Sequence, residues 1–176
     1  NLKFRGISTH PGQVYGCTTR AALEEVAKLE KDIMKRAADA LAAAGFPCEI
    51  ISSGSTPTFE IAVKDKTLNV SHPGNYTFFD NIQISLGTCG EDACSLRVLA
   101  TVVSHPSEGF YLFDAGSKCL GLDQGAHGNS AIKGFGYVVG HPDLTIVGLS
   151  EEVAKVKADG TCDLQVGDQV EIIPNH

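Results

Sequence analysis

The sequence of 176 residues has no tryptophan, a single methionine (Met34) and only 7% aromatic residues. It also has no apolar run approaching the ~20 residues that a membrane-spanning helix needs. Basic residues are not in excess, since 14 lysines and arginines stand against 21 acidic residues for a net charge of −7. A surface of that sign repels phosphate backbones and anionic lipids, so we expect neither nucleic acid nor a membrane as a partner.

The six cysteines include no Cys-x-x-Cys pair, and their spacing is irregular. The closest two, Cys89 and Cys94, flank a short Gly-Glu-Asp-Ala turn. This pattern is typical neither of a disulfide scaffold nor of a zinc cluster. We expect most of the cysteines to be reduced and buried, and the protein to be cytoplasmic. Because the chain begins at Asn1 and not at methionine, we expect a trimmed start or a piece of a longer protein.

Residues 1–65 have the pattern of an α/β structure. The sequence predicts strands at 2–7 and 48–52, a long helix that begins after Thr18 or Thr19 and ends at Gly45, and a short helix at 59–63. The apolar residues at helical spacing predict its buried face: Ala22, Val26, Leu29, Ile33, Ala37 and Leu41. Strand, helix and strand in this order are typical of a parallel sheet.

Residues 66–176 are rich in short β-branched and aromatic runs. They predict strands at 68–71, 77–85, 96–104, 110–113, 144–147 and 169–173, with a glycine-rich loop at 114–143. The fold class is therefore α+β, with an α/β part followed by a mainly antiparallel β-domain.

Three small polar loops each follow a predicted strand, at 9–16, 53–58 and 72–76. In the second, Ser-Gly-Ser-Thr-Pro-Thr, small residues expose backbone N–H groups, hydroxyls add donors and a helix start follows, which suits a phosphate group. A plain capped loop and a Pro-Gly turn are the alternatives for the second and third loops. Three such loops at strand ends favour a shared pocket.

Three further residues could carry chemistry. Lys118 could be a Schiff-base lysine if it were desolvated, although an exposed lysine is the ordinary expectation. His127 lies in a Gly-Ala-His-Gly segment and by itself indicates little. His176, the last residue, is either a frayed end or one half of a metal site.

Six segments, in order along residues 4–176, resemble the D-threonine aldolase and D-serine dehydratase family of pyridoxal-phosphate enzymes, which have the alanine-racemase fold. They are Thr-His-Pro-Gly-x-x-Tyr-Gly at 9–16, Ser-Gly-Ser-Thr-Pro-Thr at 53–58, His-Pro-Gly-Asn-Tyr-x-Phe-x-Asp at 72–80, Asp-Ala-Gly-Ser-Lys at 114–118, Leu-Ser-Glu-Glu at 149–152 and Val-Gly-Asp-x-Val-x-Ile-x-Pro-Asn-His at 166–176. The resemblance implies that residues 1–75 are the last strands of a (β/α)₈ barrel that binds pyridoxal phosphate, and that residues 76–176 are a β-rich C-terminal domain.

The resemblance also implies roles for particular residues. Those that would hold the cofactor are Gly54, Ser55 and Thr56 at its phosphate, with Tyr76 assisting, and Tyr15 lining the pocket. His176 would bind a divalent metal (Mn, Zn or Mg), and the family's second ligand lies two residues later, beyond this sequence. No residue matches the Schiff-base lysine, so no catalytic residue is assigned. Val153 stands where the family commonly has histidine.

The implied function is part of a metal-activated lyase that cleaves D-3-hydroxy amino acids, such as D-threonine to glycine and acetaldehyde. We expect the chain alone to be inactive, and to form a homodimer or associate with the remainder of the enzyme. One alternative is a D-serine dehydratase-type lyase that gives pyruvate and ammonia. Others are a non-catalytic partner module and a small phosphate-binding protein.

Overall fold

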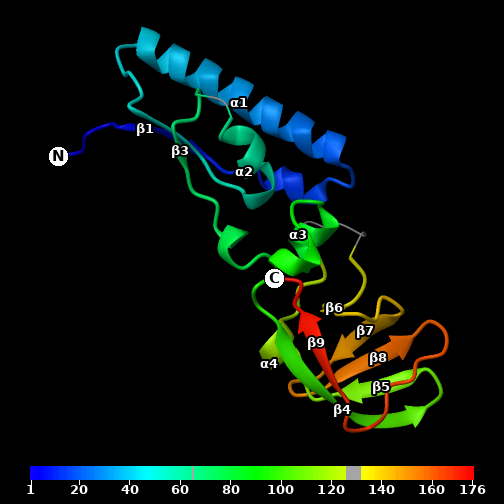
Figure 1. Ribbon diagram of the computed structural model, residues 1–176. Coiled ribbons are helices and arrows are strands. Elements are labelled where there is room, and N and C mark those ends of the chain that lie inside the picture. Colours follow the sequence, from blue (N-terminus) through cyan, green and yellow to red (C-terminus); the bar gives the residue numbers. More distant parts are fainter. Residues whose placement is uncertain (65, 126–131) are drawn as a thin grey trace. The chain divides into compact units, whose positions relative to one another are not determined.

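The computed structural model describes residues 1–64, 66–125 and 132–176 (Figure 1). The chain divides into two compact units, which are described separately below. The first unit comprises Asn1–Thr77 with Leu86–Thr88, and the second comprises Phe78–Ser85 with Cys89–His176.

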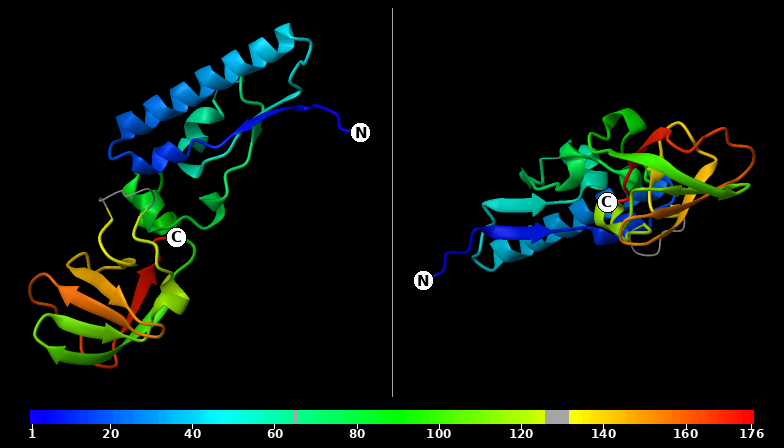
Figure 2. Two further views of the ribbon diagram at one scale, coloured as in Figure 1. Left: turned by 180° about the vertical axis from the view of Figure 1, so that it is seen from behind. Right: turned by 90° about the horizontal axis from the view of Figure 1, so that it is seen from below.

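The first unit is a three-stranded parallel sheet with helices. Its strands stand in the order β1-β2-β3, with Gly6 opposite Ile50 and Ser53 opposite Ser71. The elements are β1 (Gly6–Thr9), a 3₁₀ helix (Gly12–Gly16), α1 (Arg20–Ala43), β2 (Ile50–Ser53), α2 (Thr56–Ala62), β3 (Val70–Ser71) and a 3₁₀ helix (Asn75–Thr77). Because the three strands are parallel, the loops that follow them lie at the same edge of the sheet (Figure 2).

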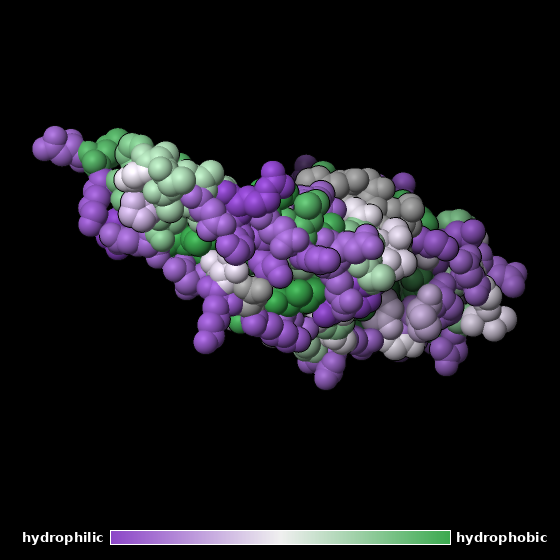
Figure 3. Space-filling view, turned by 90° about the horizontal axis from the view of Figure 1, so that it is seen from above, coloured by the Kyte–Doolittle hydropathy of each residue, from purple (hydrophilic) through white to green (hydrophobic). Residues whose placement is uncertain are grey.

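The long helix α1 is confirmed, but the predicted buried face is wrong. Thr19 caps the helix, its hydroxyl oxygen accepting the Ala22 N–H at 3.2 Å. The buried face is Leu23, Ala27, Glu30, Met34 and Ala38, whereas Leu29 and Ile33 are exposed. A prediction from the spacing of apolar residues assigns glutamate to the surface. The buried face of α1 contains Glu30, so the prediction placed the face wrongly. The space-filling view from above shows apolar patches among a mostly polar surface (Figure 3).

The second unit is built on a six-stranded antiparallel sheet in the order β6-β9-β4-β5-β8-β7. Its elements are α3 (Asn81–Ser85), a 3₁₀ helix (Glu91–Ala93), β4 (Val98–Ser107), β5 (Phe110–Phe113), α4 (Ser117–Leu120), β6 (Tyr137–Val138), β7 (Leu144–Leu149), β8 (Ala154–Ala158) and β9 (Gln169–Ile173). Alternate side chains of these strands point inward, so that Tyr111, Phe113, Val156 and Ile172 are almost fully buried. The predicted fold class, an α/β part followed by a mainly antiparallel β-domain, is confirmed.

Two local predictions differ from the structure. The strand expected at 77–85 is instead the helix α3, because the Asp80 carboxylate accepts the Gln83 N–H at 2.9 Å and so caps a helical turn. The strand β8 was not predicted, although Ala154–Ala158 alternates buried and exposed side chains. Part of the glycine-rich loop, including His127, lies outside the described residues.

The six cysteines are free thiols, but Cys94 alone is fully buried and Cys119 is exposed. Burial, reinforced by Cys94 and Asp80, raises the pKa of Cys89 to about 12. Among residues 1–64, 66–125 and 132–176, no helix is long and apolar enough to cross a membrane.

Candidate cofactor and metal sites

The three strand-end loops of the first unit are joined by hydrogen bonds. The Gly54 N–H donates to the Thr9 carbonyl at 3.2 Å, and the His72 N–H donates to the Ser53 carbonyl at 2.9 Å. The Asn75 N–H donates to Thr56 Oγ1 at 3.1 Å. The loops expected at 9–16, 53–58 and 72–76 therefore converge on one edge of the sheet.

Gly54 is small for a reason that the sequence did not reveal. A Cβ at this position would lie 1.9 Å from His72 Cδ2 and 2.2 Å from His72 Nε2, so the imidazole occupies the space beside the glycine. The ring is held there by a bond of 2.7 Å between His72 Nδ1 and Ser52 Oγ. The Gly54 N–H donates to the Thr9 carbonyl, so what the glycine provides here is room for the His72 ring beside the loop.

Ser55 and Thr56 present the hydroxyls that suit a phosphate. Both residues are 3% exposed, and Ser55 Oγ has no hydrogen-bond partner among the described residues. Thr56 Oγ1 accepts the Asn75 N–H, which leaves its own hydrogen free to donate. A buried hydroxyl without a partner is costly, and a phosphate oxygen would supply one for Ser55. The residues present therefore fit the phosphate of the implied cofactor.

The two predicted tyrosines each belong to a 3₁₀ helix that follows a strand of this sheet. Tyr15, in the 3₁₀ helix Gly12–Gly16 that contacts α2, stacks with His10 at a ring-centroid separation of 6.4 Å. Tyr76 is half exposed and lies 6.2 Å from the Phe59 ring. Both predicted cofactor-binding tyrosines thus belong to the same unit as Ser55.

Beneath the loop lies a carboxyl that sequence reasoning missed. Glu30 is 4% exposed, and its Oε1 accepts the Ser53 hydroxyl at 2.6 Å. Burial raises the pKa of Glu30, opposed by hydrogen bonding from Ser53 and Thr58 and by attraction to His10 and His72. Glu30 stands at helical spacing from the buried residues Ala27 and Met34, and this spacing was the available signal. It was missed because a charged residue is ordinarily assigned to the surface.

His176, the predicted metal ligand, belongs to the second unit. Its Nδ1 lies 2.8 Å from Asp80 Oδ2, and the Asp80 side chain is 4% exposed whereas the imidazole is 63% exposed. Metal-binding histidines commonly donate one ring N–H to a carboxylate, which directs the other nitrogen to the metal. The arrangement leaves His176 Nε2 exposed for a cation, and this fits one ligand of a metal site.

The backbone around Asp80 is arranged to hold that carboxylate. Phe79, immediately before it, has φ 51°, a conformation that costs a bulky residue about 1 kcal/mol or more. The Asn81 side chain donates to Asn175 Oδ1 at 2.8 Å, which joins the start of α3 to the residue before His176. Asp80 was within a family motif but had no predicted role. No group of three or more His, Cys, Asp or Glu in the described part of the chain is placed to hold a metal.

Lys118 is confirmed as a surface residue. Its Nζ lies 2.5 Å from Glu152 Oε1 and 3.3 Å from Glu151 Oε2, and these partners raise the pKa of the ammonium group. A lysine held in its charged form does not supply the neutral amine that a Schiff base needs. The Gly116 backbone nearby passes so close to Glu151 that a Cβ there would lie 2.2 Å from its carbonyl oxygen.

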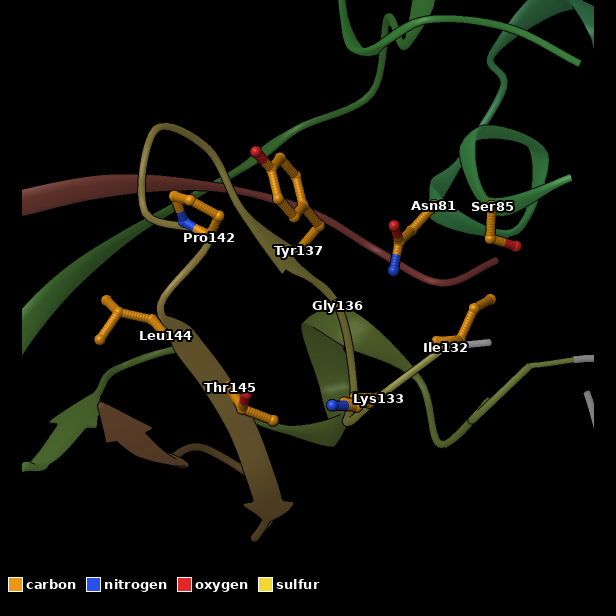
Figure 4. Close-up of a pocket in the computed structure, with 9 residues that line it drawn as sticks. All are labelled: Asn81, Ser85, Ile132, Lys133, Gly136, Tyr137, Pro142, Leu144 and Thr145. Carbon is orange, nitrogen blue, oxygen red and sulfur yellow. The ribbon is translucent and has the colours of Figure 1, made fainter. Parts of the chain in front are cut away.

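A cavity of about 200 Å³ opens between α3 and the β6–β7 region of the second unit. Figure 4 shows Asn81 and Ser85 on one side and Lys133, Tyr137 and Thr145 on the others. Its wall is continuous with Asn175 through the Asn81 amide. No sequence pattern pointed to this cavity, because its lining comes from separate parts of the chain.

Known proteins resemble this chain over almost its whole length. Residues 95–176 match the model of a family described as a putative serine dehydratase domain. The chain is 33% identical to a D-serine dehydratase of Dictyostelium discoideum, over 99% of this chain and 48% of that protein. The chain belongs to the D-serine dehydratase and D-threonine aldolase family.

Other members support the same assignment. A D-threonine aldolase of Arthrobacter is 26% identical over 99% of this chain and 45% of that protein. The solved D-threo-3-hydroxyaspartate dehydratase of Delftia is 31% identical with a TM-score of 0.87, over 99% of this chain and 50% of that one. A cysteine-to-alanine variant of an enzyme of that name was solved in the metal-free form. The chain spans about half the length of the curated relatives it matches.

Proposed function

We propose that this chain supplies the phosphate loop and one metal ligand of a pyridoxal-phosphate lyase that acts on D-3-hydroxy amino acids. The observation that carries the proposal is the edge where three parallel strands end, with the buried hydroxyls of Ser55 and Thr56 beside each other. The Asp80–His176 pair supports it from the second unit.

In this proposal the chain binds and orients, and the cofactor supplies an electron sink when it is bound. The Ser55 and Thr56 hydroxyls donate to the phosphate oxygens, and the His72 ring covers Gly54. Asp80 accepts a hydrogen bond from His176 Nδ1, which leaves Nε2 as the atom that would hold a divalent cation, and that cation would supply a Lewis acid.

Within the lyases, our first candidate is the dehydratase branch. The matching family model is described as a serine dehydratase domain, and two dehydratases are 33% and 32% identical to the chain. Two aldolases are 29% and 26% identical and a further dehydratase is 28% identical, so identity alone does not separate the branches. Cleavage of D-threonine to glycine and acetaldehyde, suggested by the Asp-Ala-Gly-Ser-Lys segment, is the second candidate. With D-threonine as a common substrate, a dehydratase releases a 2-oxo acid and ammonia, so the products distinguish the two.

A binding experiment tests the role of this chain directly. Equilibrium dialysis of pyridoxal phosphate should show an affinity that falls about tenfold or more in Thr56→Ala, because a buried charge-assisted hydrogen bond is worth ~1.5–3 kcal/mol. Ser107→Ala, an exposed serine at the end of β4, is the control and should bind like wild type. Equal affinity of all three proteins would refute the phosphate loop.

The reaction is tested with the whole gene product, cofactor, Mn²⁺ or Zn²⁺ and D-threonine. We expect a 2-oxo acid, and no product from the 176-residue chain alone, since no residue in it matches the family's Schiff-base lysine. Turnover by this chain alone would contradict the proposed division of roles.

A further inference from the structure

Glu30 is a buried acidic residue of the helix α1. It is 4% exposed on the face of α1 that packs on the sheet. Its Oε1 accepts the Ser53 hydroxyl, but its Oε2 is buried and has no hydrogen-bond partner among the described residues. An ionised carboxylate oxygen in that position is costly, so the neutral acid is favoured over the ion more than it is in water.

The groups around this carboxyl come from four elements. His10 follows β1 and His72 follows β3, and both attract the ionised form. The Ser53 hydroxyl at the end of β2 donates to Glu30. The Thr58 hydroxyl of α2, which donates to the Ser55 carbonyl at 3.4 Å, also favours the ionised form of Glu30. The two histidines are the charged groups with the largest electrostatic effect on Glu30.

The same carboxyl holds the start of the phosphate loop. Ser53 is the last residue of β2, and Gly54 and Ser55 follow it directly. A doubly charged anion at Ser55 and Thr56 would therefore stand close to Glu30. Like charges at short separation disfavour the ionised carboxylate, and burial already does so. Protonation of Glu30 removes that repulsion without breaking the bond from Ser53.

We propose that Glu30 is a positioning residue of the phosphate loop, and that a doubly charged anion binds there together with one proton taken up by Glu30. The proton comes from solvent and forms an O–H bond on the Glu30 carboxyl, so no other bond changes. The inference rests on the proposed function for the identity of the loop as a phosphate site.

Sulfate is the probe, because it keeps two negative charges throughout the neutral range and adds no titration of its own. Its binding to the 176-residue chain is measured by calorimetry from about pH 5 to about pH 9, in buffers that differ in ionisation enthalpy. Wild type should lose affinity by up to about tenfold per pH unit above the Glu30 pKa. Glu30→Gln keeps His10 and His72, so its sulfate affinity should fall less steeply with pH than that of wild type. On binding sulfate it should also take up fewer protons than wild type, by up to about one per molecule.

The outcomes separate the inference from the proposed function. Equal pH slopes and equal proton uptake in wild type and Glu30→Gln would overturn the role of Glu30 and leave the phosphate loop standing. No sulfate binding by wild type, or binding that Thr56→Ala leaves unchanged, would overturn both, because the ion would not occupy the loop. The inference is supported if sulfate affinity falls more steeply with pH in wild type than in Glu30→Gln, and if Thr56→Ala loses sulfate binding.

Ser53→Ala provides a second test if Glu30→Gln does not fold. Removing the Ser53 hydroxyl takes away a hydrogen bond that lowers the Glu30 pKa. The pH at which sulfate affinity begins to fall should therefore move upward in Ser53→Ala. An unchanged midpoint in that variant would overturn the proton linkage.

Discussion

Replacing Gly54 by alanine tests the packing of His72 against the proposed phosphate loop. The added Cβ would lie 1.9 Å from His72 Cδ2, well under the 3.0 Å that real contacts respect, so the ring has to leave. His72 is an exposed residue, and its ring can swing into solvent. The cost is then the bond to Ser52 Oγ, ~1 kcal/mol, plus lost ring packing.

Gly74→Ala is the matched control, because a Cβ there meets nothing within 4 Å. Alanine restricts the unfolded chain at both positions and so stabilises by ~0.4–1 kcal/mol in each variant. We therefore expect Gly54→Ala to be less stable than Gly74→Ala by about 1–2 kcal/mol. Urea unfolding followed by circular dichroism measures the difference.

A double-mutant cycle identifies the cause. Ser52→Ala removes the partner of the His72 ring without adding an atom at Gly54. If the ring is displaced in Gly54→Ala, adding Ser52→Ala should cost little more, so the two effects will not add. Strict additivity, or equal stability of Gly54→Ala and Gly74→Ala, would refute the packing argument.

Three further predictions concern other parts of the chain. Burial raises the pKa of Glu30 in the folded state. The stability that wild type has over Glu30→Gln should therefore be present at low pH and be lost as pH rises from the ordinary glutamate range through the raised pKa. A difference in unfolding free energy that does not change with pH would contradict this. Thr19→Ala should destabilise the chain by ~1 kcal/mol through loss of the α1 cap, whereas the exposed neighbour Thr18→Ala should change it little in the same unfolding assay. With a pKa of about 12, Cys89 should resist iodoacetamide at neutral pH while the exposed Cys119 reacts, and peptide mass spectrometry would reveal the opposite order.

Local patterns were enough to predict several elements and the edge where the loops meet. A cap at Thr19 and a regular apolar period specified α1, and strand and helix alternation specified a parallel sheet. Parallel strands bring their following loops together whatever the details of packing, so the grouping of Ser55 with Tyr76 could be foreseen.

The failures have two physical causes, which are a local cap inside a strand-like run and partners distant in sequence. Asp80 turned a β-like run into α3, and its bond to His176 joins residues 96 positions apart. Hydropathy could not reveal Glu30 as a buried residue, because its bond to Ser53 depends on where α1 packs on the sheet.

By itself, the sequence determined the strand–helix–strand order of the first unit, the parallel and antiparallel character of the two units, and the loop that presents Ser55 and Thr56. These follow from local spacing, capping and turn chemistry, which each short segment carries within itself. Only the tertiary structure decided that His72 covers Gly54 and that Glu30 lies beneath the loop. Such contacts depend on side chains from different elements meeting in space, which no single segment specifies.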